Sequence, residues 1–90
     1  MKAIITVLST DREGIIAQIS GLLFENGINI LDISQTILSS TYFTMVMLVD
    51  LSKMKISFKE MTDLLNRTGE EMGMEIRMQR SEIFDAMHRL

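Results

Sequence analysis

Within residues 8–18, LSTDREGIIAQ, the sequence pattern changes from that of a strand to that of a helix. The residues that lead into this stretch, Ala3–Leu8, read AIITVL and predict a strand that is apolar on both faces. Beyond Gly14, apolar residues recur at helical spacing and predict a helix. The polar loop between the two elements, residues 9–14, is therefore either a plain strand-to-helix turn or a loop shaped to hold a small molecule.

The first helix is expected to begin inside this polar loop. Thr10 and Glu13 have the spacing of a capping box, with Thr10 as the N-cap. Asn26 and Gly27 are expected to end the helix, because Gly27 suits a left-handed backbone. The apolar stripe of this helix comprises Ile15, Ile16, Ile19, Leu22 and Leu23.

A hairpin of two strands is predicted next. The apolar residues of Ile28–Leu38 change parity along the strand, and a β-bulge near residues 31–32 would reconcile the two phases. Ser39 and Ser40 predict a turn. Tyr42–Leu51 is almost continuously apolar and predicts a central strand.

The last third of the chain predicts a helix, a strand and a further short helix. Ser57 is the expected cap of a helix that ends at Gly73. Residues 74–80, MEIRMQR, alternate apolar and polar side chains and predict a half-exposed strand. Residues 83–90, IFDAMHRL, carry apolar residues at helical spacing and predict a short amphipathic C-terminal helix.

This order predicts the α+β class and a ferredoxin-like βαββαβ fold: a four-stranded antiparallel sheet with two helices on one face and a short C-terminal helix. The first and third strands would be central. Since both are apolar on both faces, the sheet would keep an apolar patch opposite the helices. We expect the C-terminal helix, a second copy or both to cover it, and hence a homodimer or higher oligomer. The patch would include some of Ala3, Ile5, Val7, Phe43, Met45 and Met47.

Composition argues against several classes of function. The 90 residues include no cysteine, and His88 is the single histidine, so disulfides and thiolate metal sites are excluded and no metal site is expected. A net charge of −3, with both signs interspersed, argues against nucleic acid or an anionic membrane as the partner. The apolar start is too short for a membrane span, which needs roughly 20 residues, so we expect a cytoplasmic protein.

Catalysis and RNA binding are weakly supported. Ser9, Ser34 and Thr36 have no histidine near them in the sequence that could activate a nucleophile, so no catalytic residue is predicted. Tyr42 and Phe43 could mimic the stacking platform of an RNA-binding sheet, but no basic residues interleave with them. The internal methionines are better explained as adaptable core filler than as copper ligands, and no cofactor is expected.

The polar loop has features of a binding site for a zwitterion. A helix N-terminus presents unsatisfied N–H groups, and a glycine lets a ligand approach the backbone closely. The carboxylate of an amino acid could lie on the N–H groups of Gly14 and Ile15, with its ammonium group near Asp11. Asn29 and Asp32, from a neighbouring subunit, are the other candidates for the ammonium group.

A purely structural interpretation explains the same residues. Thr10 and Glu13 would cap the helix, and Gly14 would permit tight packing of the helix on the sheet. Asn29 would be a turn residue, and Asp32 a solvated position on an edge strand. Only the combination of these residues favours a binding site.

The stretch Val7–Thr36, VLSTDREGIIAQISGLLFENGINILDISQT, resembles the signature of the ACT domain family. The shared pattern is a strand, then Asp-Arg-x-Gly and an aliphatic residue, an apolar helix, and an exit through Gly-x-Asn-Ile. The hairpin YFTMVMLVD and the ending IFDAMHRL are similar to small stand-alone ACT proteins related to glycine-cleavage regulators. The resemblance covers essentially the whole chain and implies one ACT-like domain over residues 1–90.

This resemblance implies a regulatory, non-catalytic module. ACT domains pair side by side and bind amino acids between subunits, which implies a homo-oligomeric sensor that modulates a partner enzyme or regulator protein. The family's ligand loop matches Ser9, Asp11, Glu13, Gly14 and Ile15, and its polar contact on the second strand matches Asn29.

The chain departs from the family pattern at Glu13, where many members that bind amino acids carry proline. Many of them also have asparagine or histidine near the positions of Asp11 and Ser9. An acidic loop would select a different ligand or none. A ligand-free assembly or dimerisation module is therefore the alternative function.

Overall fold

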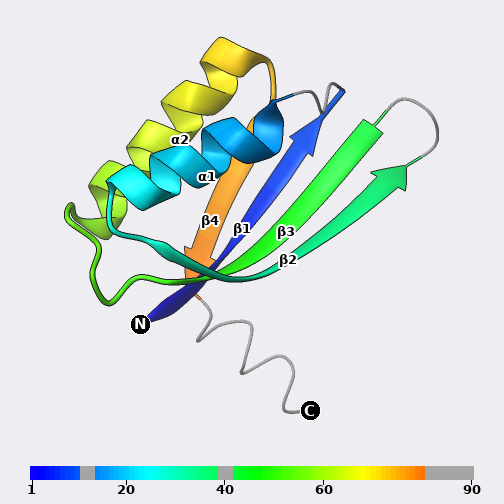
Figure 1. Ribbon diagram of the computed structural model, residues 1–90. Helices are drawn as coiled ribbons and strands as arrows, with labels where there is room; N and C mark the ends of the chain where they lie inside the picture. The colour runs from blue at the N-terminus through cyan, green and yellow to red at the C-terminus, as the bar shows by residue number, and fades with distance from the viewer. Residues whose placement is uncertain (11–13, 39–41, 81–90) are drawn as a thin grey trace.

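Figure 1 presents the computed structural model, which describes residues 1–10, 14–38 and 42–80. The predicted βαββαβ order is confirmed. The turn predicted at residues 39–40 and the helix predicted at residues 83–90 lie outside the described part of the chain. The elements are β1 (Lys2–Ser9), α1 (Ile15–Glu25), β2 (Asn29–Leu38), β3 (Tyr42–Asp50), α2 (Phe58–Met72) and β4 (Glu75–Arg80).

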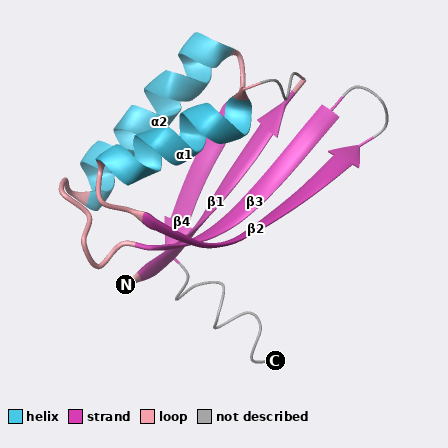
Figure 2. Ribbon diagram, viewed as in Figure 1, coloured by secondary structure: helices cyan, strands magenta, loops and turns pink. Residues whose placement is uncertain are grey.

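The four strands form one antiparallel sheet in the order β2-β3-β1-β4. The prediction that the first and third strands are central is therefore confirmed, and both helices cover the same face of the sheet (Figure 2). The predicted β-bulge is also confirmed. Ile30 pairs with Val49 and Asp32 pairs with Leu48, so Leu31 is the extra residue.

The core lies between the helices and the sheet. Each helix buries three residues at a spacing of four, which places them on one stripe. Ile16, expected on the stripe of α1, is instead 36% exposed. The buried residues are Ile15, Ile19 and Leu23 on α1, and Met61, Leu65 and Gly69 on α2.

The predicted patch on the second face is wrong in its membership. Every residue named for it is buried on the helix-covered face. The second face carries the alternate residues of the central strands, which include Thr6 and Thr44 as well as the apolar Ile4, Leu8, Val46 and Leu48. When a strand is apolar on both faces, its alternation does not reveal which face the helices cover.

Local signals set the ends of the helices. Asn26 caps α1, and Gly27 follows it with φ 76°. The Ile28 N–H donates to the Leu23 carbonyl at 2.9 Å and the Gly27 N–H to the Phe24 carbonyl at 3.1 Å, a Schellman motif. This confirms the predicted end of the first helix.

The expected boundaries of α2 are confirmed as well. Ser57 caps its N-terminus in a capping box with Glu60, and Gly73 ends it with φ 70°.

Candidate functional site

The junction between β1 and α1 differs from the prediction. The N-cap of α1 is Gly14, at φ 72°, and no side chain among the described residues caps the helix. The predicted capping box is therefore wrong, because Thr10 stands four residues before the N-cap and cannot reach the first turn in that role. Asp11 and Glu13 lie outside the described residues.

The hydrogen bonds that the described residues form in the first turn of α1 involve backbone atoms alone. The first intrahelical hydrogen bond runs from the Gln18 N–H to the Gly14 carbonyl at 3.0 Å. The N–H groups ahead of Gln18 have no intrahelical acceptor, and they carry the positive end of the helix dipole. Gly14 is exposed and Ile15 is buried beneath it, so the backbone here faces outward.

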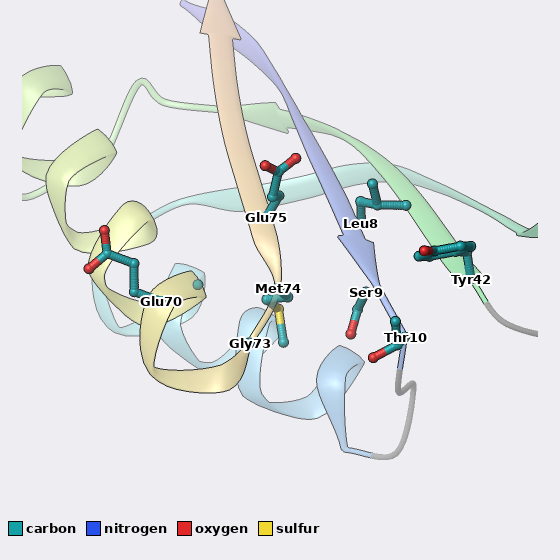
Figure 3. Close-up of a pocket in the computed structure, with 9 residues that line it drawn as sticks. Leu8, Ser9, Thr10, Tyr42, Glu70, Gly73, Met74 and Glu75 are labelled. Carbon is teal, nitrogen blue, oxygen red and sulfur yellow. The ribbon is translucent and has the colours of Figure 1, made fainter.

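Ser9 lies beside this turn at the end of β1, and it is 5% exposed. Figure 3 shows Ser9 and Thr10 at the end of β1, with Tyr42 on β3 and Met74 at the α2–β4 junction. These residues line a pocket of about 300 Å³, together with Leu8, Gly69, Glu70, Gly73 and Glu75.

Sequence reasoning missed the part of this pocket that comes from the far third of the chain. The predicted strand order contained the signal, because β4 was expected beside β1. The pairing of Leu8 with Glu75 places the turn before β4 next to the first loop. The lining is mainly apolar, with two carboxylates, so the pocket suits an apolar ligand that carries a cationic group.

Asn29 and Asp32 lie far from that junction within one chain. Asn29 pairs with Asp50, which pairs with Lys2, at the end of the sheet opposite Ser9. Lys2 and Ser9 are seven residue steps apart along β1, a distance of roughly 24 Å. Asp32 is exposed and lies on the open face of the sheet, since its partner is Leu48. Of the predicted site residues that the structure describes, Asn29 and Asp32 thus lie apart from Ser9, Gly14 and Ile15 within a single chain.

At the Asn29 end of the sheet, the surroundings of Asp50 lower the pKa of its carboxyl group. The Ser52 N–H donates to the Asp50 carboxylate at 2.9 Å, and this hydrogen bond lowers the pKa of Asp50 below its usual value. The N-terminal ammonium group and Lys2 lower the pKa of Asp50 further. Asp50 therefore stays ionised beside Asn29 at neutral pH.

A second pocket, of about 440 Å³, opens at the exit of α1. Phe24, which is 82% exposed, lines it together with Asn29, Lys53 and Lys55. The Lys55 N–H donates to the Asn26 carbonyl at 2.9 Å, which holds the loop after β3 against the end of α1. Within residues 1–10, 14–38 and 42–80, neither lysine forms an ion pair.

Two further observations bear on function. No helix in the described part of the chain is long and apolar enough to cross a membrane. Among the same residues, no three histidine or acidic side chains come together as they would in a metal centre.

The fold and the two ends of the sheet define a class: a small ferredoxin-like α+β domain with an open edge strand and a ligand-sized pocket at each end. The family model of the ACT domain matches residues 2–79. The chain belongs to the ACT domain family, as its sequence resemblance predicted.

Individual relatives and solved structures match over most of this chain. A UPF0237 protein of Clostridium acetobutylicum is 50% identical over 90 residues, which is 100% of both chains. The structure of an ACT domain protein from Streptococcus pneumoniae has a TM-score of 0.83 and 43% identity over 93% of each chain. A structure assigned to a glycine cleavage system transcriptional repressor has a TM-score of 0.68 and 26% identity, covering 87% of this chain and 44% of that one.

Proposed function

We propose that this chain is a regulatory module of the cytoplasm. It would act as a homo-oligomeric sensor that binds a small amino acid between two copies and passes its state to a partner enzyme or regulator protein. The separation of the candidate residues is the main support for this proposal. Gly14 and Ile15 lie at one end of the sheet and Asn29 at the other, so a site that uses all three needs two copies.

The edge strand β2 could form the interface between two copies that such a site needs. It is ten residues long, and among the residues that the structure describes it pairs only with β3. Antiparallel pairing of two β2 edges about a two-fold axis places the start of each strand beside the end of the other. Leu38 at the end of β2 pairs with Tyr42, and Ser9 pairs with Phe43, so both lie at one end of the sheet. This pairing brings Asn29 of the partner subunit toward the first loop.

The chemistry of such an interface suits a zwitterion. The carboxylate of the amino acid lies on the N–H groups of Gly14 and Ile15, at the positive end of α1. The ammonium group meets the Asp11 carboxylate. Ser9 and Glu13 complete the loop, and Asn29 and Asp32 of the partner subunit supply polar contacts.

A site shared by two copies couples ligand binding to assembly. A ligand that contacts both copies binds the paired state more tightly than the separate state, and it shifts the population toward that pair. A difference of about 1–3 kcal/mol between the two states is enough for regulation. The neighbour assigned as a transcriptional repressor supports a regulatory role of this kind.

Calorimetry with each common amino acid, run beside light scattering, tests the proposal. We expect one small amino acid to bind and to raise the dimer fraction. Asn29→Ala should weaken binding at least tenfold, because the amide contact is lost while the exposed side chain leaves the fold intact. Asn66→Ala, at an exposed position on α2, is the matched control and should bind as the parent protein does.

The ligand-free assembly module is the alternative, and the acidic loop favours it. Asp11 and Glu13 both repel a carboxylate that approaches the first turn of α1. This function predicts the same oligomer with or without amino acids and no calorimetric signal for any of them. That result would overturn the sensor and leave assembly as the function.

A further inference from the structure

The pocket at the exit of α1 combines an aromatic ring with two positive charges. Phe24 is 82% exposed, and Lys53 and Lys55 line the same pocket from the loop after β3. Its volume of about 440 Å³ lies within the range of sites for small organic molecules, about 300–1,000 Å³. The pocket is therefore large enough for a ring that carries one charged group.

The two lysines lie on the same side of the segment that follows β3. In residues 53–56, KMKI, both lysines are exposed, whereas Met54 and Ile56 are half-buried and pack against the core. The two apolar side chains therefore fix the orientation of the segment and leave both lysines on its outer side. As a result, both ammonium groups belong to one small region of the surface.

Backbone contacts hold the two walls of this pocket together. The loop after β3 lies beside the turn from α1 into β2 (Figure 2), and the Lys55 N–H donates to the Asn26 carbonyl at 2.9 Å. A β-carbon at Gly27 would collide with the Lys53 carbonyl oxygen, so the close approach of the two segments requires glycine there. The pocket is thus formed within one chain before a ligand binds, which lowers the cost of binding.

The charges of the lining favour an anion. Glu25, the last residue of α1, is the one acidic residue in the lining, so the two lysines leave the pocket with a net positive charge. Among the residues that the structure describes, neither lysine forms an ion pair. Asp50 lies outside this lining, and its carboxylate accepts a hydrogen bond from the Ser52 N–H. Lysine ammonium groups bind carboxylates and phosphates as point charges.

We propose that this pocket binds a small aromatic anion, namely a ring that carries a carboxylate or a phosphate group. The ring packs on Phe24, and the anionic group contacts the ammonium groups of Lys53 and Lys55. The inference does not rest on the proposed amino-acid sensor. The pocket is complete in one chain, lies at the end of the sheet opposite Ser9, and shares only Asn29 with the proposed sensor site.

An NMR titration of the whole chain with phenyl phosphate tests the site. We expect saturable shifts of the backbone amide signals of Gly27, Lys53 and Lys55. Inorganic phosphate lacks the ring and benzylamine reverses the charge, so each should bind at least tenfold more weakly. Phenylacetate, titrated separately, shows whether a carboxylate is also bound. The proposal is wrong if neither aromatic anion gives saturable shifts at these residues, or if benzylamine binds as well as they do.

Substitutions of exposed residues provide an independent measurement with the same probe. Lys53→Gln combined with Lys55→Gln should weaken binding at least tenfold, because both ammonium groups are lost. Glu25→Gln should tighten binding several-fold, because it removes the carboxylate that repels the anion. Arg67→Gln removes a positive charge from an exposed position on α2 outside the pocket lining, and it should bind as the parent protein does. A double lysine variant with parent affinity, or weaker binding by Glu25→Gln, would show that these charges do not form the site.

The contribution of the ring is measured separately. Phe24→Leu keeps an apolar side chain but removes the aromatic face, so it should weaken the binding of phenyl phosphate about fivefold. The same variant should leave the weak binding of inorganic phosphate unchanged. Equal affinity of Phe24→Leu and the parent protein for phenyl phosphate would show that the ring of the ligand does not pack on Phe24.

Discussion

At the scale of single residues, glycines decide how tightly the segments of this chain approach one another. Gly27 joins α1 to β2 at φ 76°, and a β-carbon there would collide with the Lys53 carbonyl oxygen. Gly69 lies in α2, where a β-carbon would stand 2.7 Å from the Met74 carbonyl oxygen. Gly21, on the outside of α1, faces open space, and a β-carbon there would meet nothing within 4 Å.

These contacts predict opposite effects for the same substitution. Gly27→Ala should lower the free energy of unfolding by at least about 2 kcal/mol, since it adds a collision to an unfavourable left-handed backbone. Gly21→Ala should raise the free energy of unfolding by about 0.5–1 kcal/mol, because alanine favours the helix and meets nothing. Urea unfolding of both variants measures the difference. Equal effects would show that Gly27 tolerates a side chain.

At the scale of elements, two stretches share one sequence signal but differ in structure. Thr10–Glu13 and Ser57–Glu60 both have capping-box spacing. In the second, the Glu60 N–H donates to the Ser57 hydroxyl at 3.1 Å and the Ser57 N–H donates to the Glu60 carboxylate at 3.2 Å. In the first, the helix starts only after Gly14, whose left-handed backbone breaks the helical path. The spacing alone cannot reveal this break.

The two caps should therefore respond differently to alanine. Ser57→Ala should lower the free energy of unfolding by about 1 kcal/mol, because two N–H groups at the start of α2 lose their capping geometry. Thr10→Ala should cost less than about 0.5 kcal/mol, as expected for an exposed residue that caps no helix. Chemical denaturation gives both values. A cost for Thr10→Ala as large as that for Ser57→Ala would restore the capping role of Thr10.

At the scale of the whole molecule, the strand order and every helix boundary except the start of α1 could be predicted from sequence, whereas the site could not be assembled. Periodicity identifies β4, whose Ile76 and Met78 are buried between exposed residues. It cannot choose a face for β1, where Ile4 and Ile5 are equally apolar. Sequence separation also gives no sign that Leu8 pairs with Glu75. It likewise gives no sign that Asn29 lies at the end of the sheet opposite Ser9. Those relations follow from the sheet register, and the site as we propose it uses a second copy.

A substitution of Phe24 tests directly whether two copies assemble through the β2 side of the molecule. It is 82% exposed and lines the same pocket as Asn29, the first residue of the edge strand β2. A large exposed aromatic beside an unpaired edge is typical of an interface anchor. Phe24→Glu should therefore convert the proposed oligomer to monomer in light scattering and leave the helical circular dichroism unchanged, because the exposed side chain contributes little to the core of one copy. Asn66→Glu places the same charge on the exposed side of α2 and should leave the mass unaltered. A Phe24→Glu protein that keeps the parent mass would show that assembly does not use the β2 side of the molecule.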